Sequence, residues 1–473
     1  MRNTGMLLLV LLMFGNPLQA AQVTHGPMAG HATDQSVSIW VRADETCAYS
    51  VQLQAAHGGT KLTSKTVTLN GENNFCGMAH IKGLLPSTTY SYKIFLDGAE
   101  QATPVAQKVT TYPSEGKPGI IRFAFGHGVN GKDPQPIWDA IAAKQPMFFL
   151  IMGDNIYSNS TEPAKQRSMY LQMRADPRFR SFGAQVPMYA VYDDHDFGAN
   201  NSDRTQPGKE RSLRTFFEMW ANPPAQTIEQ PGIWTRFVAG QCEFWLLDGR
   251  YHRSPNKNPD GPNKTMLGME QRAWFMNSLA KSKALFKFPV SGSSWHCGGK
   301  EAWNHQFLYE YDTILSHVRE HRISGLILLG GDQHTCKVSI RPRESWGGYD
   351  LHEWMAGRLV NPNRDYEAQP WSRGFGLVTV NTEIDPPTTT LEFFNDKGQT
   401  HAGTKVLYTG PGALRAMWDS PAGAFGKPPR SFDGELRPLT AAEIWGKLPT
   451  TTGYTIPWTE LQWPKDGWED RRW

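Results

Sequence analysis

The most constraining feature of this chain is a run of five bulky apolar residues, 148–152, that ends in Gly153-Asp154. Such a run is typical of a central strand that is buried on both faces. The glycine lets the chain turn and leaves Asp154 at the carboxyl end of the strand, where ligands bind in open α/β sheets. Residues 327–331 repeat the design, followed by Asp332 and then His334. The two stretches predict an α/β fold with a metal site at its strand ends. The alternative is that each Gly-Asp pair is only a turn.

The densest polar stretch follows a third β-prone run and contains Asp193, Asp194, His195, Asp196 and Asn200. Adjacent carboxylates repel one another unless cations or hydrogen-bond donors neutralise them. A bound cation accounts for this stretch economically, and a polar surface loop is the alternative. Oxygen ligands suit Ca²⁺ or another hard cation, while histidine and tyrosine extend the range to Fe, Mn or Zn.

Two further strands are expected to bring polar side chains to the same region. Residues 121–125 form an apolar strand that precedes His127 and Asn130, and residues 136–144 have a helical pattern. This order predicts a βαβ unit with parallel strands, which places His127 or Asn130 beside Asp154. The apolar run at 244–247 leads through Asp248 to Arg250, a candidate clamp for a phosphate group. Pairing of Arg250 with Asp248 or with a surface carboxylate is equally compatible with the sequence.

The chain divides into four segments. Residues 1–20 resemble a secretory signal peptide, with an uncleaved anchor as the alternative. Short stretches of alternating polarity within 21–113 predict a small β-sandwich domain. A linker rich in proline and glycine precedes a larger α/β domain at 119–400, which carries the polar motifs. Residues 401–473 are rich in tryptophan and proline. Their pattern predicts no particular fold, and a cap over the site is one role for them.

Composition narrows the classes of partner. The net charge of +3 arises from scattered lysines and arginines, so no nucleic-acid track is evident, and no later stretch is long and apolar enough to cross a membrane. We expect a monomeric protein. Of the five cysteines, Cys47 and Cys76 lie in one expected domain of an exported chain and are predicted to form a disulfide.

Taken in order, the motifs at 153–157, 193–201, 247–251 and 330–334 resemble the alkaline phosphatase D (PhoD-like) family of calcineurin-like metallophosphoesterases. The resemblance implies a four-layer sandwich of two β-sheets flanked by helices, behind an N-terminal fibronectin III-like β-sandwich. It also implies a dinuclear metal site, with His195 as proton donor and Arg250 contacting the substrate. The implied metal ligands are Asn130, Asp154 (bridging), Tyr157, Asp194, Asn200, Asp332 and His334.

One departure from the family pattern concerns the first motif. Relatives carry Ser-Cys where this chain has His127-Gly128, so the thiolate that would bind ferric iron is absent. Either His127 substitutes from the adjacent position or the iron site is altered. We therefore expect Ca²⁺ together with a second divalent or ferric ion.

The resemblance implies a secreted or periplasmic metal-dependent phosphoesterase, acting on monoesters or diesters. The alternative is a non-catalytic relative that binds phosphorylated or glycan ligands, an idea motivated by the missing cysteine and by the seventeen tryptophans.

Overall fold

The computed structural model describes residues 20–224, 231–296, 301–360, 373–400 and 406–409. The expected signal segment at 1–19 and nearly all of the C-terminal segment at 401–473 lie outside the described residues. No helix in the described ranges has the length and apolar character needed to span a bilayer.

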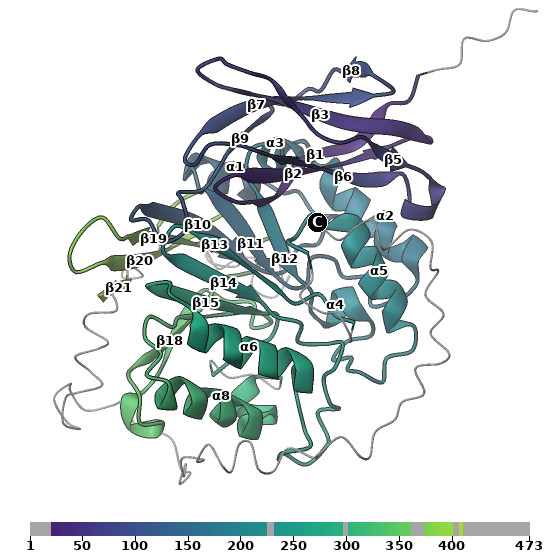
Figure 1. The fold of residues 1–473 in the computed structure, drawn as a ribbon. Helices are drawn as coiled ribbons and strands as arrows, with labels where there is room; N and C mark the ends of the chain where they lie inside the picture. The colour runs from purple at the N-terminus through teal and green to yellow at the C-terminus, as the bar shows by residue number, and fades with distance from the viewer. Residues whose placement is uncertain (1–19, 225–230, 297–300, 361–372, 401–405, 410–473) are drawn as a thin grey trace, which may run out of the picture.

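Two six-stranded sheets form the centre of the molecule (Figure 1). The first has the order β12 (Met188–Val191), β11 (Phe148–Met152), β10 (Ile120–Gly126), β19 (Gly374–Asn381), β20 (Thr388–Asn395) and β21 (Val406–Thr409). The second has the order β13 (Thr235–Ala239), β14 (Cys242–Leu246), β15 (Phe286–Ser291), β16 (Leu328–Gly330), β18 (Leu351–Met355) and β17 (Lys337–Arg341). Strands β10, β11 and β12 are mutually parallel, as are β14, β15, β16 and β18, so each sheet gathers several carboxyl ends at one edge.

Helices cover the outer faces of both sheets. In Figure 1, α6 and α8 lie along the second sheet, whereas α1 and α3 lie beside the first. The helices are α1 (Ile137–Ala143), α2 (Pro163–Ala175), α3 (Pro177–Gly183), α4 (Asp194–Phe197), α5 (Lys209–Met219), α6 (Met269–Lys281), α7 (Trp303–Gln306) and α8 (Leu308–Glu320), with 3-10 turns at Gly71–Asn73 and Arg343–Ser345. The predicted fold class, two sheets flanked by helices, is confirmed.

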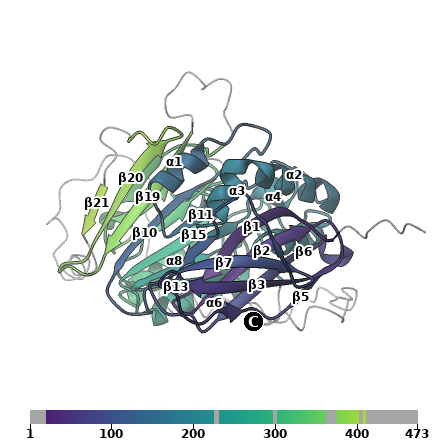
Figure 2. The same ribbon diagram turned by 90° about the horizontal axis from the view of Figure 1, so that it is seen from above.

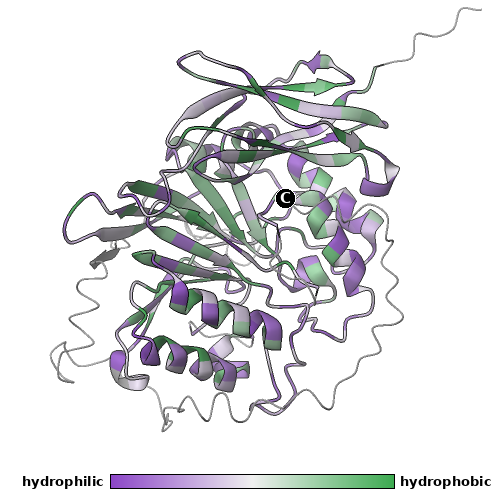
Figure 3. Cartoon of the chain, viewed as in Figure 1, coloured by the Kyte–Doolittle hydropathy of each residue, from purple (hydrophilic) through white to green (hydrophobic). Residues whose placement is uncertain are grey.

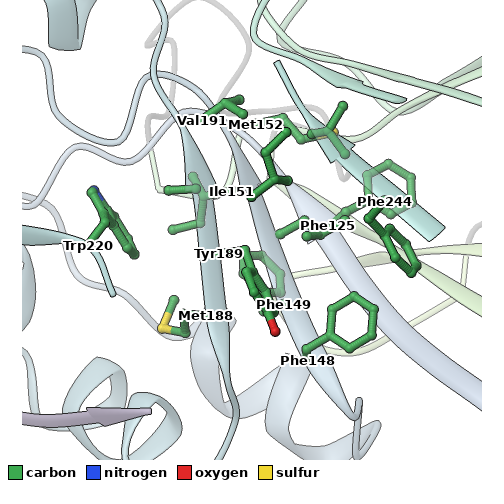
Figure 4. Close-up of a cluster of buried hydrophobic side chains, with 14 of the residues drawn as sticks. Phe125, Phe148, Phe149, Ile151, Met152, Met188, Tyr189, Val191, Trp220 and Phe244 are labelled. Carbon is green, nitrogen blue, oxygen red and sulfur yellow. The ribbon is translucent and has the colours of Figure 1, made fainter. Parts of the chain in front are cut away.

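Strand β11 is buried on both faces, as its uninterrupted apolar sequence predicts. Phe148 packs edge-on against Phe244 of the second sheet, with ring centroids 5.1 Å apart. Its neighbour Phe149 points the other way and packs against Trp138 of α1 at 5.5 Å. Figure 4 shows Phe148, Phe149 and Phe244 among the buried cluster, and in Figure 3 strand β11 and its neighbours are mostly coloured as hydrophobic. Burial on both faces gives the sheet edge, and any site on it, a rigid support.

The N-terminal strands form two small sheets that lie against the first central sheet (Figures 1 and 2). One has the order β1 (Val23–Ala32), β2 (Ser36–Ala43), β6 (Cys76–Lys82), and the other β4 (Leu62–Thr63), β3 (Cys47–Ala55), β7 (Thr89–Leu96), β8 (Ala99–Gln101), with β5 (Val67–Leu69) on β3 and β9 (Lys108–Thr110) on β7. Trp40 of β2 connects the N-terminal sheets to α5, because its Nε1 donates a hydrogen bond to the carbonyl oxygen of Glu218 at 2.8 Å. The Arg174 guanidinium stacks on the Trp40 ring at 4.3 Å.

The predicted disulfide between Cys47 and Cys76 is wrong, because both are free, buried thiols. Cys47 stands opposite Leu69 in one N-terminal sheet, and Cys76 stands opposite Arg42 in the other. Strand pairing thus assigns each thiol to a different sheet. A shared domain alone does not bring two cysteines within bonding distance. Burial raises the pKa of Cys76 to about 12, which makes its thiol unreactive. Cys297 lies outside the described residues.

Candidate metal centre

The polar motifs meet where β11, β12 and β16 end. The chain turns immediately after each apolar strand, and three of the polar residues there have left-handed backbones. The φ angles are 50° at Asp154, 70° at Asp332 and 46° at His334. Non-glycine residues rarely adopt positive φ, and such strain is concentrated at functional sites.

Two glycines allow these strand ends to approach one another. A β-carbon on Gly153, where φ is 88°, would lie 2.6 Å from the Cβ of Asp193. A β-carbon on Gly331 would overlap the carbonyl oxygen of Met152, which belongs to the other central sheet. The glycines of the two Gly-Asp motifs therefore do more than form turns, because they bring the ends of both sheets together.

Asp154, Asp194 and His195 form the centre of the site. Each can offer one ligand atom, and these three atoms lie within 4.8 Å of one another. Asp154 and Asp194 are buried, at 2% and 3% exposure. The Oδ1 of Asp154 is buried without a hydrogen-bond partner, and so is the Oδ2 of nearby Asp193. Buried carboxylate oxygens normally have partners, so these oxygens fit a bound cation.

The raised pKa values of the carboxylates at this edge also indicate a cation site. Burial raises the pKa of Asp154 well above its ordinary value, and the neighbouring carboxylates of Asp194, Asp193, Asp196 and Asp332 raise it further. Burial likewise raises the pKa of Asp193 to about 8 and that of Asp332 to about 6. A divalent cation would reverse this penalty by stabilising the ionised carboxylates.

His334 and Tyr157 complete the group on one side of Asp154. The Nε2 of His334 lies 3.2 Å from the Tyr157 hydroxyl and 3.6 Å from the Oδ2 of Asp154. Burial lowers the pKa of His334 to about 4, so its ring is neutral and Nε2 can bind a metal. Of the predicted ligands, Asp154, Tyr157, Asp194 and His334 are thus brought together. Asp332 is near enough for its charge to affect Asp154.

Comparison with known proteins agrees with this geometry. A profile described as PhoD-like phosphatase matches residues 130–350, which contain the four motifs at 153–157, 193–201, 247–251 and 330–334. This segment belongs to the PhoD-like phosphatase family. A profile for a domain of unknown function matches residues 20–114.

The individual relatives of this chain are distant in sequence. Alkaline phosphatase D of Bacillus subtilis (strain 168) is 22% identical over 207 residues, a match that covers 37% of this chain and 35% of that protein, so the match spans about a third of the relative's length. A solved structure of PhoD superposes with a TM-score of 0.65 at 15% identity, covering 82% of this chain and 94% of that one. Purple acid phosphatase PPD1 from yellow lupin (Lupinus luteus) seeds gives 0.57 at 12% identity, covering 82% and 75%. At these identities the two structures establish the fold alone.

Two asparagines predicted as ligands have other surroundings in the PhoD-like domain. The Oδ1 of Asn130 accepts a hydrogen bond from the backbone N–H of Lys132 at 3.3 Å, within its own loop. Asn200 is exposed, and it is the backbone N–H of the next residue, Asn201, that donates to the Oδ2 of Asp194 at 2.6 Å. Their role as ligands remains a prediction.

His127 does not replace the family thiolate in this geometry. Its Nδ1 lies 2.9 Å from the Ala356 carbonyl oxygen, to which it can only donate. Its Nε2 accepts a hydrogen bond from the backbone N–H of His334 at 3.0 Å. Both ring nitrogens are therefore engaged, which leaves no lone pair for a metal. The ring instead stacks on that of His334, 5.3 Å away, and supports its left-handed backbone.

The structure places Arg250 away from the surface of the site, where the expected role as a phosphate clamp would require it. Its side chain is fully buried. Its Nε donates to the Oδ1 of Asp193 at 2.5 Å, its Nη2 to Glu301 at 2.8 Å and its Nη1 to the Ser202 carbonyl at 3.1 Å. Because Asp193 and Ser202 lie on either side of the loop that carries Asp194 and His195, Arg250 holds that loop from behind.

Substituting Arg250 with methionine should destabilise the fold. The change would leave the ionised Glu301 and the buried carboxyl of Asp193 without their main partner, and breaking such a buried pair typically costs roughly 3–5 kcal/mol. Chemical denaturation would measure the loss. Arg178→Met is the matched control, because Arg178 pairs with Asp139 at the surface and should cost about 1 kcal/mol or less. Equal losses in the two variants would contradict the structural role of Arg250.

Three other residues of the site were assigned no individual role from the sequence, although Asp196 lies within the polar stretch already noted. Glu301 follows no recognisable motif, yet Arg250 and Arg253 overcome the effect of its burial and lower its pKa to about 2. Asp196 accepts hydrogen bonds from the backbone N–H groups of Asn155, Ile156 and Asp193, which joins two motif loops. Arg358 adds, after burial, to the lowering of the His334 pKa. Each acts through a partner distant in the chain, so spacing could not identify it.

The raised pKa values predict how metal affects stability. A carboxylate whose folded pKa lies above its unfolded value, ~3.9 for aspartate, lowers the free energy of unfolding as pH rises toward the folded pKa. For Asp332 and Asp193 this window runs from about pH 4 to about 6 and about 8. Stabilisation by added Ca²⁺ or Mn²⁺, relative to chelated protein, should therefore be larger at pH 8 than at pH 5.5. Denaturation curves that show the same metal stabilisation at both pH values would contradict this.

Proposed function

We propose that this protein is an exported, metal-dependent phosphoesterase. The observation that carries the proposal is the convergence of Asp154, Asp194 and His195 within 4.8 Å, at a buried edge where carboxylate oxygens have no partner. Membership of residues 130–350 in the PhoD-like phosphatase family supports the reaction class. Export rests on the signal-like sequence of residues 1–20.

We assign two cations to the site. Asp154 would contact both, because its Oδ2 lies 3.6 Å from the Nε2 of His334 and its ligand atom lies within 4.8 Å of that of Asp194. His334 and Tyr157 would serve one ion, while Asp194 and Asp332 would serve the other, with Asn130 and Asn200 as further candidates. When bound, the cations would polarise the phosphoryl group and offset the charge that develops during displacement. Most of these donors are oxygens, which favours Ca²⁺ with a second divalent ion.

His195 is the residue we assign to proton transfer. It follows Asp194 at the start of α4, and its ring packs on that of Tyr157 with centroids 4.6 Å apart. It is partly exposed, so a substrate oxygen can approach it from solvent. In this role it would donate a proton to the departing alkoxide, a contribution of roughly 10²–10⁴ in rate.

A metal-reconstitution assay tests the proposal. The purified protein is chelated, its metals are measured, and it is reloaded with Ca²⁺, Mn²⁺ or Fe³⁺ singly and in pairs. Hydrolysis of nitrophenyl phosphate and of bis-nitrophenyl phosphate then reports monoesterase and diesterase activity. Activity that depends on added metal supports the proposal. Stoichiometric metal binding without hydrolysis of either ester would favour the non-catalytic, ligand-binding alternative.

The missing thiolate yields a prediction about metal identity. A β-carbon on Gly128 would lie 3.2 Å from the Tyr157 hydroxyl, so a side chain there would point into the site. Gly128→Cys should therefore increase iron retention after chelation, despite a cost of about 1–2 kcal/mol from its φ of 77°. Gly128→Ser is the matched control, with the same strain but no thiolate.

Elemental analysis and the visible absorption of the Fe³⁺–tyrosinate pair are the measurements. The native protein should show little or no such colour. Stoichiometric iron with that band in the native protein would contradict the expectation.

A further inference from the structure

The loop of residues 157–159, which follows β11, contacts both the backbone and the side chain of His195. The Oγ of Ser158 donates to the His195 carbonyl oxygen at 2.9 Å, and the backbone N–H of Asn159 donates to the same oxygen at 3.2 Å. The Tyr157 ring packs against the imidazole. The backbone and one face of His195 are thus fixed by residues 157–159.

The orientation of the imidazole depends on one side chain. The Nδ1 of His195 lies 2.7 Å from the Oδ1 of Asn159. An amide oxygen only accepts hydrogen bonds, so this contact requires a proton on Nδ1. With Nδ1 engaged, Nε2 is the nitrogen that can act at the cluster formed with Asp154 and Asp194.

We propose that Asn159 is a positioning residue that fixes the His195 ring with Nδ1 protonated and Nε2 directed to the reacting phosphoester. This inference rests on the proposed phosphoesterase function. It belongs to a position that the sequence motifs do not mark, since Asn159 lies just beyond the 153–157 motif. A ring held in one orientation loses less freedom when it meets the leaving oxygen, and so transfers its proton more readily.

Asn159 offers unusually clean variants because its backbone is left-handed, with φ of 48°. Glycine accepts that conformation without strain, so Asn159→Gly removes the Oδ1 acceptor and leaves the loop path unchanged. Asn159→Asp keeps an oxygen acceptor at the same place and tolerates the same backbone. The pair separates the loss of the hydrogen bond from any disturbance of the loop.

The first readout does not require activity. Nitrogen-15 and proton NMR of the histidine rings in metal-free protein should show His195 with its proton on Nδ1 in the native chain and in Asn159→Asp. The Asn159→Gly variant should show a mixture of the two tautomers. An unchanged tautomer in Asn159→Gly would overturn the proposal.

The second readout is kinetic. Loss of one such hydrogen bond should lower kcat for alkyl phosphates by roughly three- to tenfold. The loss should be absent with nitrophenyl phosphate, whose leaving group needs little protonation. The Asn159→Asp variant should keep most of the native kcat for alkyl phosphates.

Metal affinity is the control. Calcium and manganese affinities, measured by titration calorimetry, should stay within about twofold of the native values, since one neutral hydrogen bond is lost and no ligand is removed. Equal losses on both esters, or a fall in metal affinity that matches the fall in kcat, would overturn the positioning role. If the native protein hydrolyses neither ester, the proposed function fails, while the NMR result still decides whether Asn159 orients the ring.

Discussion

Replacing Asp154 with asparagine is expected to remove both the bound metal and the phosphoesterase activity. Asp154 stands at the end of a fully buried strand, lies 3.6 Å from His334, and has a buried oxygen without a protein partner. Asparagine is nearly the same size but neutral, so it cannot offset the charge of two cations. Elemental analysis and the metal-reconstitution assay measure the two losses.

Stability distinguishes this effect from unfolding. Burial and four neighbouring carboxylates raise the pKa of Asp154, so its charged form destabilises the metal-free fold near neutral pH. The metal-free Asp154→Asn variant should therefore be at least as stable as the native metal-free protein. Asp139→Asn at the surface should change neither metal content nor activity. Full metal occupancy in Asp154→Asn would refute the bridging assignment.

Replacing His195 with alanine is expected to lower turnover by roughly 10²–10⁴ on alkyl phosphates, because the leaving alkoxide then lacks its proton donor. The loss should shrink with nitrophenyl phosphate, whose leaving group is stable as an anion. Steady-state kinetics across a series of leaving groups measure the difference.

Metal content decides between two roles for His195, because its ligand atom lies within 4.8 Å of those of Asp154 and Asp194. As a proton donor, it can be removed without loss of metal. As an essential ligand, its removal would lower metal occupancy and activity together on every substrate, which would contradict the acid role. His57→Ala, in an exposed loop of the N-terminal part, is the control and should leave kinetics and metal content unchanged.

The sequence by itself determined where the central strands lie in the chain and at which end of each strand the polar residues stand. Five consecutive apolar residues are stable only where both faces are covered, and β11 is buried on both faces. A Gly-Asp pair after such a strand must lie at its carboxyl end, and parallel strands bring such ends together. For this reason Asp154 and Asp194 could be placed at one sheet edge without coordinates. His334 follows β16 of the other sheet, and it was added to the site by the repeated strand design and by the family resemblance.

The tertiary structure alone decided which partner each polar side chain has. Arg250 was expected at the substrate, but folding buries it between Asp193 and Glu301. His127 was expected at a metal, but the carbonyl of Ala356 and the backbone of His334 occupy both its ring nitrogens. Local pattern encodes the element and its polarity, because these depend on neighbouring residues. The hydrogen bonds of a buried polar group depend on segments that packing brings from hundreds of residues away, and on the need to leave no such group without a partner.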